Sequence, residues 1–503
     1  MPASTTLLQR LLTAGAALSL VAAIGVNASV ARAITAPTIT VIDINPSGDS
    51  YALDEDDQDS VAVNGVLLFS ADNGTNGYEL YKSDGTVAGT VLVKDINPTG
   101  GSYIDNMIAM GSYAYFEATD GSSYELWKSD GTEAGTVKVK EINPTGSSNP
   151  RNFAVVGSTL YFRADDGTNG DELWKSDGTE AGTVMVKDIN TSGDSYPSNL
   201  VAVGSTLYFE AENSTDGEEL WKSDGTEAGT VMVKDIYSGG GSDPNYLTVV
   251  GSTIYFAAYD GTNGYELWKS NGTSAGTVMV KDINTSGDGY PSDLTAVGST
   301  LYFRANDGTN GYELWKSNGT SAGTVMVKDI HTSGDSYPGE LTAVGSTLYF
   351  EAYDSTTGYE LWKSDGTSAG TVMVRDIDMG STSASPDNVR RHGDLIYFFA
   401  YTNTDGFELY LSDGTEAGTM RIPAPAATDY VNCDCYDNPI RSTAVGMFFT
   451  YYDNTVGHEL GFVSDLLPET NTSSNGLALA LLALSGALAA GAVIARRKEL
   501  RAN

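Results

Sequence analysis

Short segments rich in apolar, aromatic and β-branched residues alternate with polar punctuation along most of the chain. In one stretch, Asn199–Val203 and Leu207–Ala211 are separated by Gly204 and Ser205, and residues 219–223 and 230–234 flank Asp224 and Gly225. Segments of strand length that are bounded by Gly, Asp and Asn are typical of β-hairpins. No window of useful length has the period of a helix. The pattern therefore predicts an all-β protein.

The same pattern returns every 46 to 48 residues. A motif that opens Glu-Leu and runs on to Ser-Asp-Gly-Thr-like residues starts at Glu79, Glu125, Glu172, Glu219, Glu266, Glu313, Glu360 and Glu408, with a degenerate copy at Glu459. All six tryptophans occupy one position of the motif: Trp127, Trp174, Trp221, Trp268, Trp315 and Trp362. A residue that every repeat needs is usually structural, so we expect these side chains to pack between repeats. A ring of exposed aromatics that binds sugars is the alternative.

Four short antiparallel strands in about 47 residues match one blade of a β-propeller. A β-solenoid has shorter repeats, and sandwich domains need about 100 residues each. Thr38–Ile44 matches a fourth strand that no first three strands precede, whereas the last copy, near residues 442–465, has only the first three. We therefore predict one closed propeller of eight or nine blades over residues 38–465. Its N-terminal strand would complete the last blade and leave no open edge.

The motif also carries a family resemblance. Residues 219–226 read Glu-Leu-Trp-Lys-Ser-Asp-Gly-Thr, and this run and its copies resemble the ELWxxDGT repeat of bacterial secreted proteins. The resemblance covers residues 38–465. It implies a repeat architecture and export, and it transfers no catalytic residue.

The N-terminus has the features of a secretory signal peptide. A single early cation, Arg10, precedes an apolar run over Leu11–Val26, and the small-residue pattern Ala31-Arg32-Ala33 follows. This order predicts a signal peptide over residues 1–33 with cleavage after Ala33. The repeat region is therefore expected outside the cell.

The C-terminus, residues 467–503, predicts attachment to the cell surface. A short polar spacer, an apolar stretch over Leu477–Ala495 and a basic tail follow a motif formed by Leu467, Pro468, Glu469 and Thr470. The arrangement resembles the LPxTG sorting signal of Gram-positive cell-wall proteins, in which sortase cleaves after the threonine and joins the protein to peptidoglycan. Asn471 stands where that signal has glycine. Wall attachment and a permanent transmembrane helix both remain open.

Charge limits the possible ligands. The formal net charge of −37 repels phosphate backbones, so nucleic acid is not an expected partner. A carboxylate run could bind Ca²⁺ through hard oxygen ligands: Asp54, Asp56, Asp57 and Asp59. The run lacks the spacing of an EF-hand loop, and a solvated run of charges is the alternative. No other cofactor is predicted.

Strand parity places the longer connections on one face of a propeller. The acidic run and a second departure from the repeat, residues 423–441, are both such connections and flank the last blade. A specific ligand site is expected there. Cys433 and Cys435, within that insertion, could form a strained disulfide, a metal half-site or an incidental pair.

The chain has few residues for enzymatic chemistry. It contains three histidines, His331, His392 and His458, and neither a G-x-S-x-G nucleophile turn nor a glycine-rich phosphate loop. We therefore predict a non-catalytic cell-surface binding or adhesion module with a glycan or protein ligand. The alternative is a secreted carbohydrate-active enzyme with paired carboxylates, which would have a deep acidic pocket and one carboxyl of raised pKa.

Overall fold

The polar residues of the repeated motif build a tight turn. The computed structural model describes residues 36–53, 59–425, 439–453 and 456–464. In the fourth complete repeat, Asp224 Oδ1 accepts hydrogen bonds from the Thr226 amide at 2.9 Å and hydroxyl at 2.7 Å. Gly225 has a φ of 86°, which glycine adopts without steric cost, and its N–H donates to Ser223 Oγ at 3.0 Å. The Ser223 and Thr230 hydroxyls lie 2.7 Å apart and join the two strands that the turn connects.

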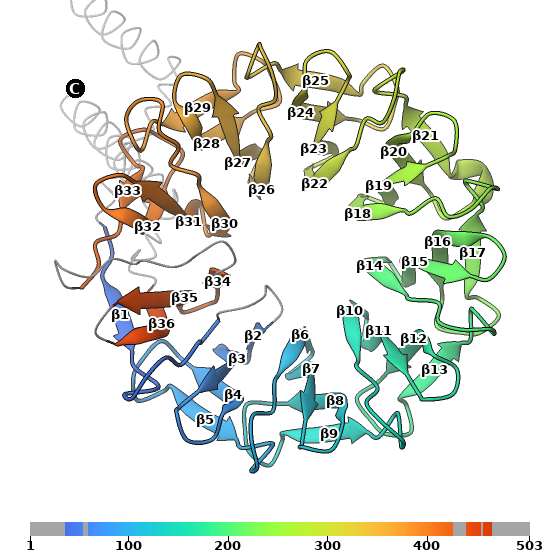
Figure 1. The fold of residues 1–503 in the computed structure, drawn as a ribbon, viewed down its shortest axis with the longest axis vertical. Helices are drawn as coiled ribbons and strands as arrows, with labels where there is room; N and C mark the ends of the chain where they lie inside the picture. Colours follow the sequence, from blue (N-terminus) through green and yellow to red (C-terminus); the bar gives the residue numbers. More distant parts are fainter. Residues whose placement is uncertain (1–35, 54–58, 426–438, 454–455, 465–503) are drawn as a thin grey trace, which may run out of the picture. The chain divides into compact units, whose positions relative to one another are not determined.

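Each repeat forms a four-stranded antiparallel sheet, and the sheets follow one another as blades around a central opening (Figure 1). Blades 1 to 3 contain β2 (Ser60–Val63), β3 (Val66–Asp72), β4 (Tyr78–Ser83) and β5 (Val91–Lys94); β6 (Asp105–Met110), β7 (Tyr113–Thr119), β8 (Tyr124–Ser129) and β9 (Val137–Lys140); and β10 (Arg151–Val156), β11 (Thr159–Asp165), β12 (Asp171–Ser176) and β13 (Val184–Lys187).

The next three blades have the same topology. Blades 4 to 6 contain β14 (Ser198–Val203), β15 (Thr206–Asn213), β16 (Gly217–Ser223) and β17 (Val231–Lys234); β18 (Asn245–Val250), β19 (Thr253–Tyr259), β20 (Tyr265–Ser270) and β21 (Val278–Lys281); and β22 (Ser292–Val297), β23 (Thr300–Asn306), β24 (Tyr312–Ser317) and β25 (Val325–Lys328). A short 3₁₀ turn, η1 (Ser274–Gly276), follows β20. The predicted strands of the repeat are therefore confirmed.

Blades 7 and 8 contain β26 (Gly339–Val344), β27 (Thr347–Asp354), β28 (Gly358–Ser364) and β29 (Val372–Arg375); and β30 (Asp387–His392), β31 (Leu395–Thr402), β32 (Gly406–Ser412) and β33 (Met420–Arg421). Blade 9 is built from both ends of the repeat region: β34 (Arg441–Ser442), β35 (Gly446–Asp453), β36 (Gly457–Ser464) and β1 (Ile39–Ile42).

The N-terminal strand completes the last blade. β1 pairs antiparallel with β36, with Ile39 opposite Val463 and Ile42 opposite Leu460. The innermost strands of successive blades contact one another from β2 to β34, and Arg441 Nε in β34 donates to Ser60 Oγ in β2 at 2.7 Å. Nine blades and closure by the N-terminal strand are thus confirmed, and the ring leaves no blade without a neighbour on either side.

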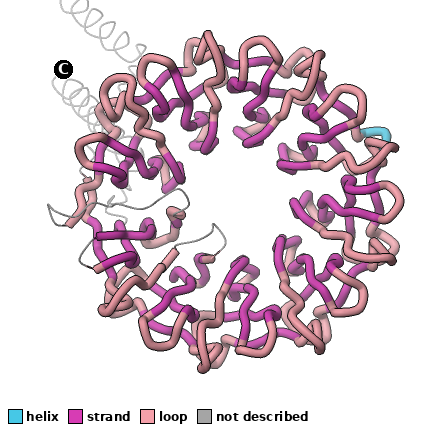
Figure 2. Tube along the Cα trace, viewed as in Figure 1, coloured by secondary structure: helices cyan, strands magenta, loops and turns pink. Residues whose placement is uncertain are grey.

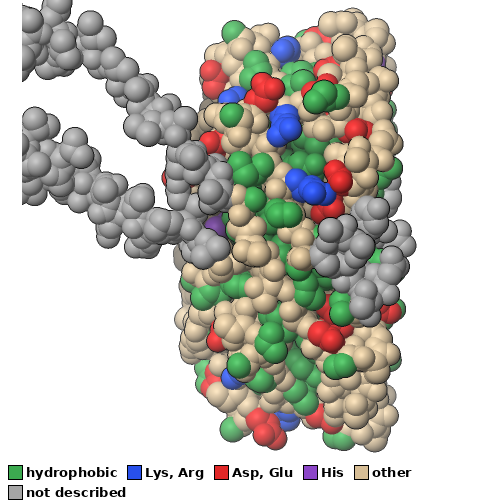
Figure 3. Space-filling model, turned by 90° about the vertical axis from the view of Figure 1, so that its left-hand side faces the viewer, with side chains coloured by type: hydrophobic (Ala, Val, Ile, Leu, Met, Phe, Trp, Pro, Cys, Tyr) green, Lys and Arg blue, Asp and Glu red, His purple; other side chains and the backbone are tan. Residues whose placement is uncertain are grey.

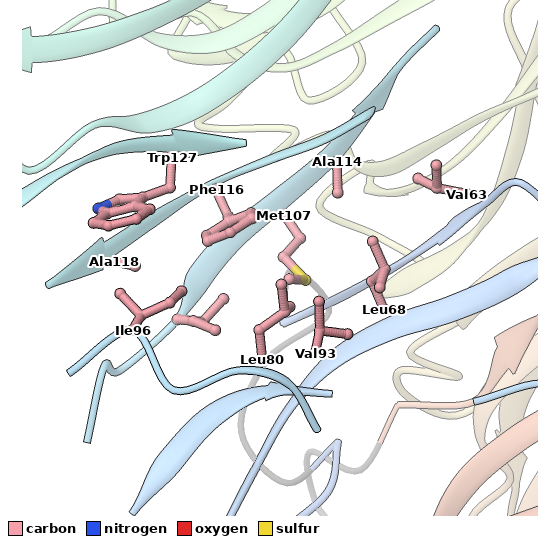
Figure 4. Packing of buried hydrophobic residues seen from close by; sticks show 11 residues of the cluster. Val63, Leu68, Leu80, Val93, Ile96, Met107, Ala114, Phe116, Ala118 and Trp127 are labelled. Carbon is pink, nitrogen blue, oxygen red and sulfur yellow. The ribbon is translucent and has the colours of Figure 1, made fainter. Parts of the chain in front are cut away.

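The core consists of layers between blades. In the layer between blades 1 and 2, Trp127 and Phe116 pack with Leu68, Leu80 and Val93 (Figure 4). All six tryptophans lie in such layers and are only 5–7% exposed, and Tyr81 and Tyr410 take the same place in blades 1 and 8. Burial of so large an apolar area at each contact is what holds neighbouring blades together.

Lysines of the motif add hydrogen bonds between blades. Lys222 Nζ donates to the Gly272 carbonyl in the turn of the next blade at 2.8 Å, and Lys234 Nζ donates to the Thr277 carbonyl at 3.0 Å. We call these two bonds the lysine clamps; the first recurs from blade 1 to blade 7, and in the second Arg375 replaces lysine in blade 7. Blade 8 carries Leu411 and Pro423 at these positions.

The strand order sorts the loops onto two faces. Strands lie around the opening and loops lie farther out (Figure 2). The connections from second to third strand and from fourth strand to the next blade share one face, which we call the loop-rich face. There, the Ser195 N–H donates to the Asp171 carbonyl at 3.0 Å, and the Glu212 N–H donates to the Ser195 carbonyl at 2.8 Å. On the rim, hydrophobic side chains alternate with acidic and basic ones (Figure 3).

Candidate binding face

Five positions of the repeat change their chemistry from blade to blade. In blade 6 they are Tyr290, Ser292, Asp293, Arg304 and Tyr312. The first lies in the connection from the preceding blade, the next two at the start of the first strand, the fourth in the middle of the second strand and the fifth at the start of the third strand. We call them the variable positions.

The range of side chains at these positions is wide. Where blade 6 has Arg304, the other copies from blade 2 to blade 7 have Glu117, Arg163, Glu210, Ala257 and Glu351. Where blade 6 has Asp293, those copies have Asn106, Asn152, Asn199, Tyr246 and Glu340. In contrast, the residues of the turn and of the blade contacts hardly change. The repeats therefore share one backbone scaffold and differ in the side chains at the variable positions.

The variable positions meet in two hollows of the loop-rich face. The first, of about 840 Å³, is lined by Glu218, Asp243, Asn245, Tyr246, Ala257, Tyr265, Tyr290, Pro291, Ser292, Arg304, Tyr312 and Tyr337. The second, of about 570 Å³, is lined by Asp293, Arg304, Tyr337, Gly339, Glu340, Glu351, Tyr359, Ser385, Pro386, Asp387 and Phe407. Both include Arg304 and Tyr337, so they are adjacent, and we call the two together the tyrosine groove. Its volumes fall within the usual range of ligand sites.

A hollow between the innermost strands borders the groove. A third hollow, of about 700 Å³, is lined by the innermost strands of blades 2 to 8 and shares Tyr246, Asp293 and Glu340 with the tyrosine groove. In each of these strands the pairing register shifts at a bulge. The second residue of the bulge has a φ between 51° and 58°, as at Tyr246 and Glu340. A β-bulge changes the direction in which a side chain points. Non-glycine residues with a positive φ cluster at functional sites.

Stacked tyrosines form the walls of the groove. Tyr290 stacks on Tyr265 with ring centroids 5.8 Å apart, and Tyr337 stacks on Tyr312 at 5.4 Å; the planes of the two pairs differ by 19° and 22°. Tyr290 and Tyr337 each have a φ of 44°. They remain 48% and 42% exposed. Each pair therefore presents a supported aromatic ring to solvent.

Arg304 is held in place between the two hollows. Its Nε donates to Ser292 Oγ at 3.0 Å, and its guanidinium lies 3.1 Å from Asp293 Oδ2 and over the Tyr312 ring at 6.0 Å. The ion pair balances the charge of Arg304. The guanidinium retains its planar shape for contacts with a ligand.

Carboxyl groups line the first hollow. The Tyr265 hydroxyl donates to Asp243 Oδ2 at 2.6 Å. A hydrogen bond with Asp243, burial and the nearby charge of Glu210 raise the pKa of Glu218 to about 7. Burial and the bond to Asp243 likewise raise the pKa of the Tyr265 phenol. Near neutral pH, the Glu218 carboxyl is therefore protonated for part of the time.

A second carboxyl of raised pKa lines the other hollow. Burial, followed by the charges of Glu340 and Asp387, raises the pKa of Glu351 to about 8. Gly339, which pairs with Glu351 across the sheet, has no side chain to fill the space beside it. A side chain at that position would begin 3.8 Å from Glu351 Oε2. This group is protonated at neutral pH and faces the hollow.

Most of the sites predicted from sequence lie outside the described residues. These are Asp54, Asp56, Asp57, Cys433, Cys435, the 467–470 motif and the signal peptide. Asp59 is described and precedes β2. Within the described ranges, no three His, Cys, Asp or Glu side chains form a group that could hold a metal ion. Among those residues, no helix has the length and apolar character needed to cross a membrane.

Sequence reasoning missed the tyrosine groove, although a signal for it is present. The sequence predicted a ligand site at the acidic run and at residues 423–441, which flank the last blade. The hollows instead lie along blades 4 to 8. Alignment of the repeats with one another isolates the variable positions without any structure. That they meet at the inner end of one face follows only from the bulges and the packing of neighbouring blades.

Comparisons with known proteins bear on the fold alone. No protein-family model matches the chain, and none of the curated proteins does. Among solved structures, a prolyl endopeptidase is 12% identical over 70% of this chain and 54% of its own, with a TM-score of 0.40. A puromycin hydrolase is 11% identical over 73% of this chain and 61% of its own, with a TM-score of 0.37. The chain thus spans little more than half the length of the structures it matches.

Proposed function

We propose that the chain is a non-catalytic, exported binding or adhesion module that presents the loop-rich face to its ligand. One observation carries the proposal: positions at which otherwise similar repeats carry different side chains line two adjacent hollows. A scaffold selected only for packing has no reason to change the side chains that line a hollow. Concave surfaces with aromatic walls and a few fixed polar groups are the usual form of ligand sites.

The proposed location rests on the two ends of the chain. Residues 1–33 have the order of a signal peptide, and Leu467, Pro468, Glu469 and Thr470 resemble a cell-wall sorting motif. The motif Glu219–Thr226 resembles the ELWxxDGT repeat of bacterial secreted proteins. On this proposal the propeller is held at the outer surface, by the wall or the membrane. Detection of the protein in wall digests, or in the membrane fraction, would distinguish the two anchors.

Calcium belongs to the proposal as a stabilising ion. Its candidate ligands are Asp54, Asp56, Asp57 and Asp59. An ion that binds only the folded protein raises the melting temperature by mass action. The full chain should therefore melt at a higher temperature with Ca²⁺ than with a chelator. Equal melting temperatures would remove calcium from the proposal.

Binding without turnover is the test of the proposed function. The purified full chain is passed over arrays of glycans and extracellular proteins, and each retained ligand is recovered and weighed by mass spectrometry. We expect saturable binding with an unchanged ligand mass. The Tyr290→Ala/Tyr337→Ala variant should lose binding, whereas Glu180→Gln, an exposed change next to an Asp-Gly turn on the other face, should not. Ligand conversion, or equal binding by all three proteins, would contradict the proposal.

A carbohydrate-active enzyme is the second candidate, and Glu351 is the observation that favours it. A neutral carboxyl beside Glu340 and Asp387 has the character of a general acid paired with a carboxylate. The enzyme would release reducing ends from polysaccharides. Glu351→Gln should then lower the rate by about a hundredfold or more. Absence of release by the unmodified protein rejects this candidate.

A further inference from the structure

Two of the exposed rings of the tyrosine groove, Tyr290 and Tyr337, are aromatic platforms at equivalent places in neighbouring blades. Tyr290 and Tyr337 are 47 residues apart in the chain, and each is backed by a second tyrosine. A tyrosine has two side-chain torsions, and stacking restricts both before any ligand arrives. Little conformational entropy is therefore lost when a ligand lies on the ring.

Fixed polar groups lie beside these platforms. Arg304 lies in both hollows and is oriented by Ser292 and Asp293. The Glu218 and Asp243 carboxyls line the first hollow next to Tyr265. Planar guanidinium and carboxyl groups hydrogen-bond well to pairs of neighbouring hydroxyls. The groove thus combines the flat apolar faces of tyrosine rings with guanidinium and carboxyl groups that can form hydrogen bonds beside them.

Sugar rings have the complementary surface, because their C–H groups form apolar faces and their hydroxyls project at the edges. The faces of aromatic rings carry partial negative charge and attract such C–H groups. Platforms repeated from blade to blade suit a ligand with repeating units. The acidic surroundings, with a net charge of −37 for the chain, disfavour phosphate or uronate polymers.

We propose that the tyrosine groove binds a neutral polysaccharide, with sugar rings on Tyr290 and Tyr337 and hydroxyl contacts to Arg304 and to the Glu218–Asp243 pair. This inference rests on the proposed binding function and specifies its ligand class. Tyr290 and Tyr337 would provide most of the affinity, as central aromatic anchors do in other interfaces. Arg304 would position the chain where it passes from one hollow to the other.

The test uses soluble neutral polysaccharides as probes. The full chain is run in affinity gels that contain dextran, mannan, amylose or a β-1,3-glucan, and any interaction is quantified by calorimetry. At least one polymer should bind, and polygalacturonate should not. Tyr337→Ala and Tyr290→Ala should each weaken binding tenfold or more, and Tyr337→Phe, which keeps the ring, should remain within about threefold.

Tyr103→Ala is the matched control. Tyr103 occupies the same place in the repeat, is 57% exposed and packs on Tyr78 at 6.1 Å, but it lies outside the groove. Its loss should leave binding unchanged. Because these rings are exposed, all variants should keep the melting temperature of the unmodified protein. A bound polysaccharide that is equally well retained by the Tyr290 and Tyr337 variants would overturn the proposal.

Failure of this inference is distinguishable from failure of the proposed function. If no polysaccharide binds but a peptide or protein ligand binds and is lost in Tyr337→Ala, the carbohydrate inference is wrong and the binding function stands. If neither class of ligand is sensitive to Tyr290 and Tyr337, both are wrong.

Discussion

The tryptophan found in six of the repeats owes its recurrence to packing. Trp221 lies between Tyr161 and Val186 of one blade and Leu207 and Phe209 of its own. The indole N–H has no hydrogen-bond partner among the described residues, so the ring contributes through its apolar area and through its face, over which Lys187 Nζ lies at 5.8 Å. Blades 1 and 8 carry tyrosine at this position, with similar burial. A smaller ring can therefore occupy the site.

This view of Trp221 predicts different outcomes for two substitutions. Trp221→Ala leaves a cavity between blades and should lower the free energy of unfolding by about 3–5 kcal/mol. Trp221→Tyr should lower the free energy of unfolding much less. The tyrosine ring still fills most of the space between the blades, and no hydrogen bond is lost. Urea unfolding followed by far-ultraviolet circular dichroism measures both. Equal losses for the two variants would show that the site requires an indole.

At the scale of elements, the contacts of blade 9 differ from all others. Blades 1 to 7 each reach the next blade through the two lysine clamps. Blade 8 has Leu411 and Pro423 in place of these cations, and blade 9 has Phe462 and Ile42. β33 and β34 are only two residues long. The contacts on both sides of blade 9 therefore depend on apolar packing with fewer hydrogen bonds between blades.

Blade 9 should consequently open before the rest of the ring. Amide hydrogen exchange reports local opening, and sub-global openings need less free energy where contacts are fewer. We expect the amides of blade 9, in β1, β35 and β36, to exchange faster than those of the central strands of other blades. The comparison strands are β15 and β16 in blade 4 and β19 and β20 in blade 5. Mass spectrometry of peptic fragments compares them directly. Uniform protection around the ring would contradict this expectation.

Prediction from the sequence succeeded for features that a single repeat determines, namely its strands and turns. Strand, turn and strand alternate within each copy, and the unmatched strand at Thr38–Ile44 indicates how the ring closes. The tyrosine groove has another origin: Tyr337 and Arg304 meet only because neighbouring blades place their bulged first strands side by side. Such contacts join residues of different repeats. Their geometry depends on blade number and register, which local patterns do not contain.

At the scale of the whole molecule, buried glutamates couple stability to pH. The glutamate of each motif is buried, and in every blade except blade 8 it accepts hydrogen bonds from the connection that follows the fourth strand. Glu219 accepts from the Ile236 and Tyr237 amides and from the Ser242 hydroxyl. Burial exceeds the opposing effect of these donors. It raises the pKa to about 7 in Glu79, Glu172, Glu219, Glu266 and Glu459, and to about 8 in Glu360.

The sign of the effect follows from these pKa values. In the unfolded chain the same groups titrate near 4.5, so between pH 4.5 and 8 the folded state binds more protons than the unfolded state. Stability is therefore highest near pH 5 and falls as pH rises through 7 to 8. Repulsion among surface carboxylates acts in the same direction, but salt screens it. The melting temperature should thus be several degrees lower at pH 8 than at pH 5, and 0.5 M NaCl should remove only part of the difference. A melting temperature that stays constant or rises over this interval would show that the motif glutamates are ionised throughout, held by their three donors.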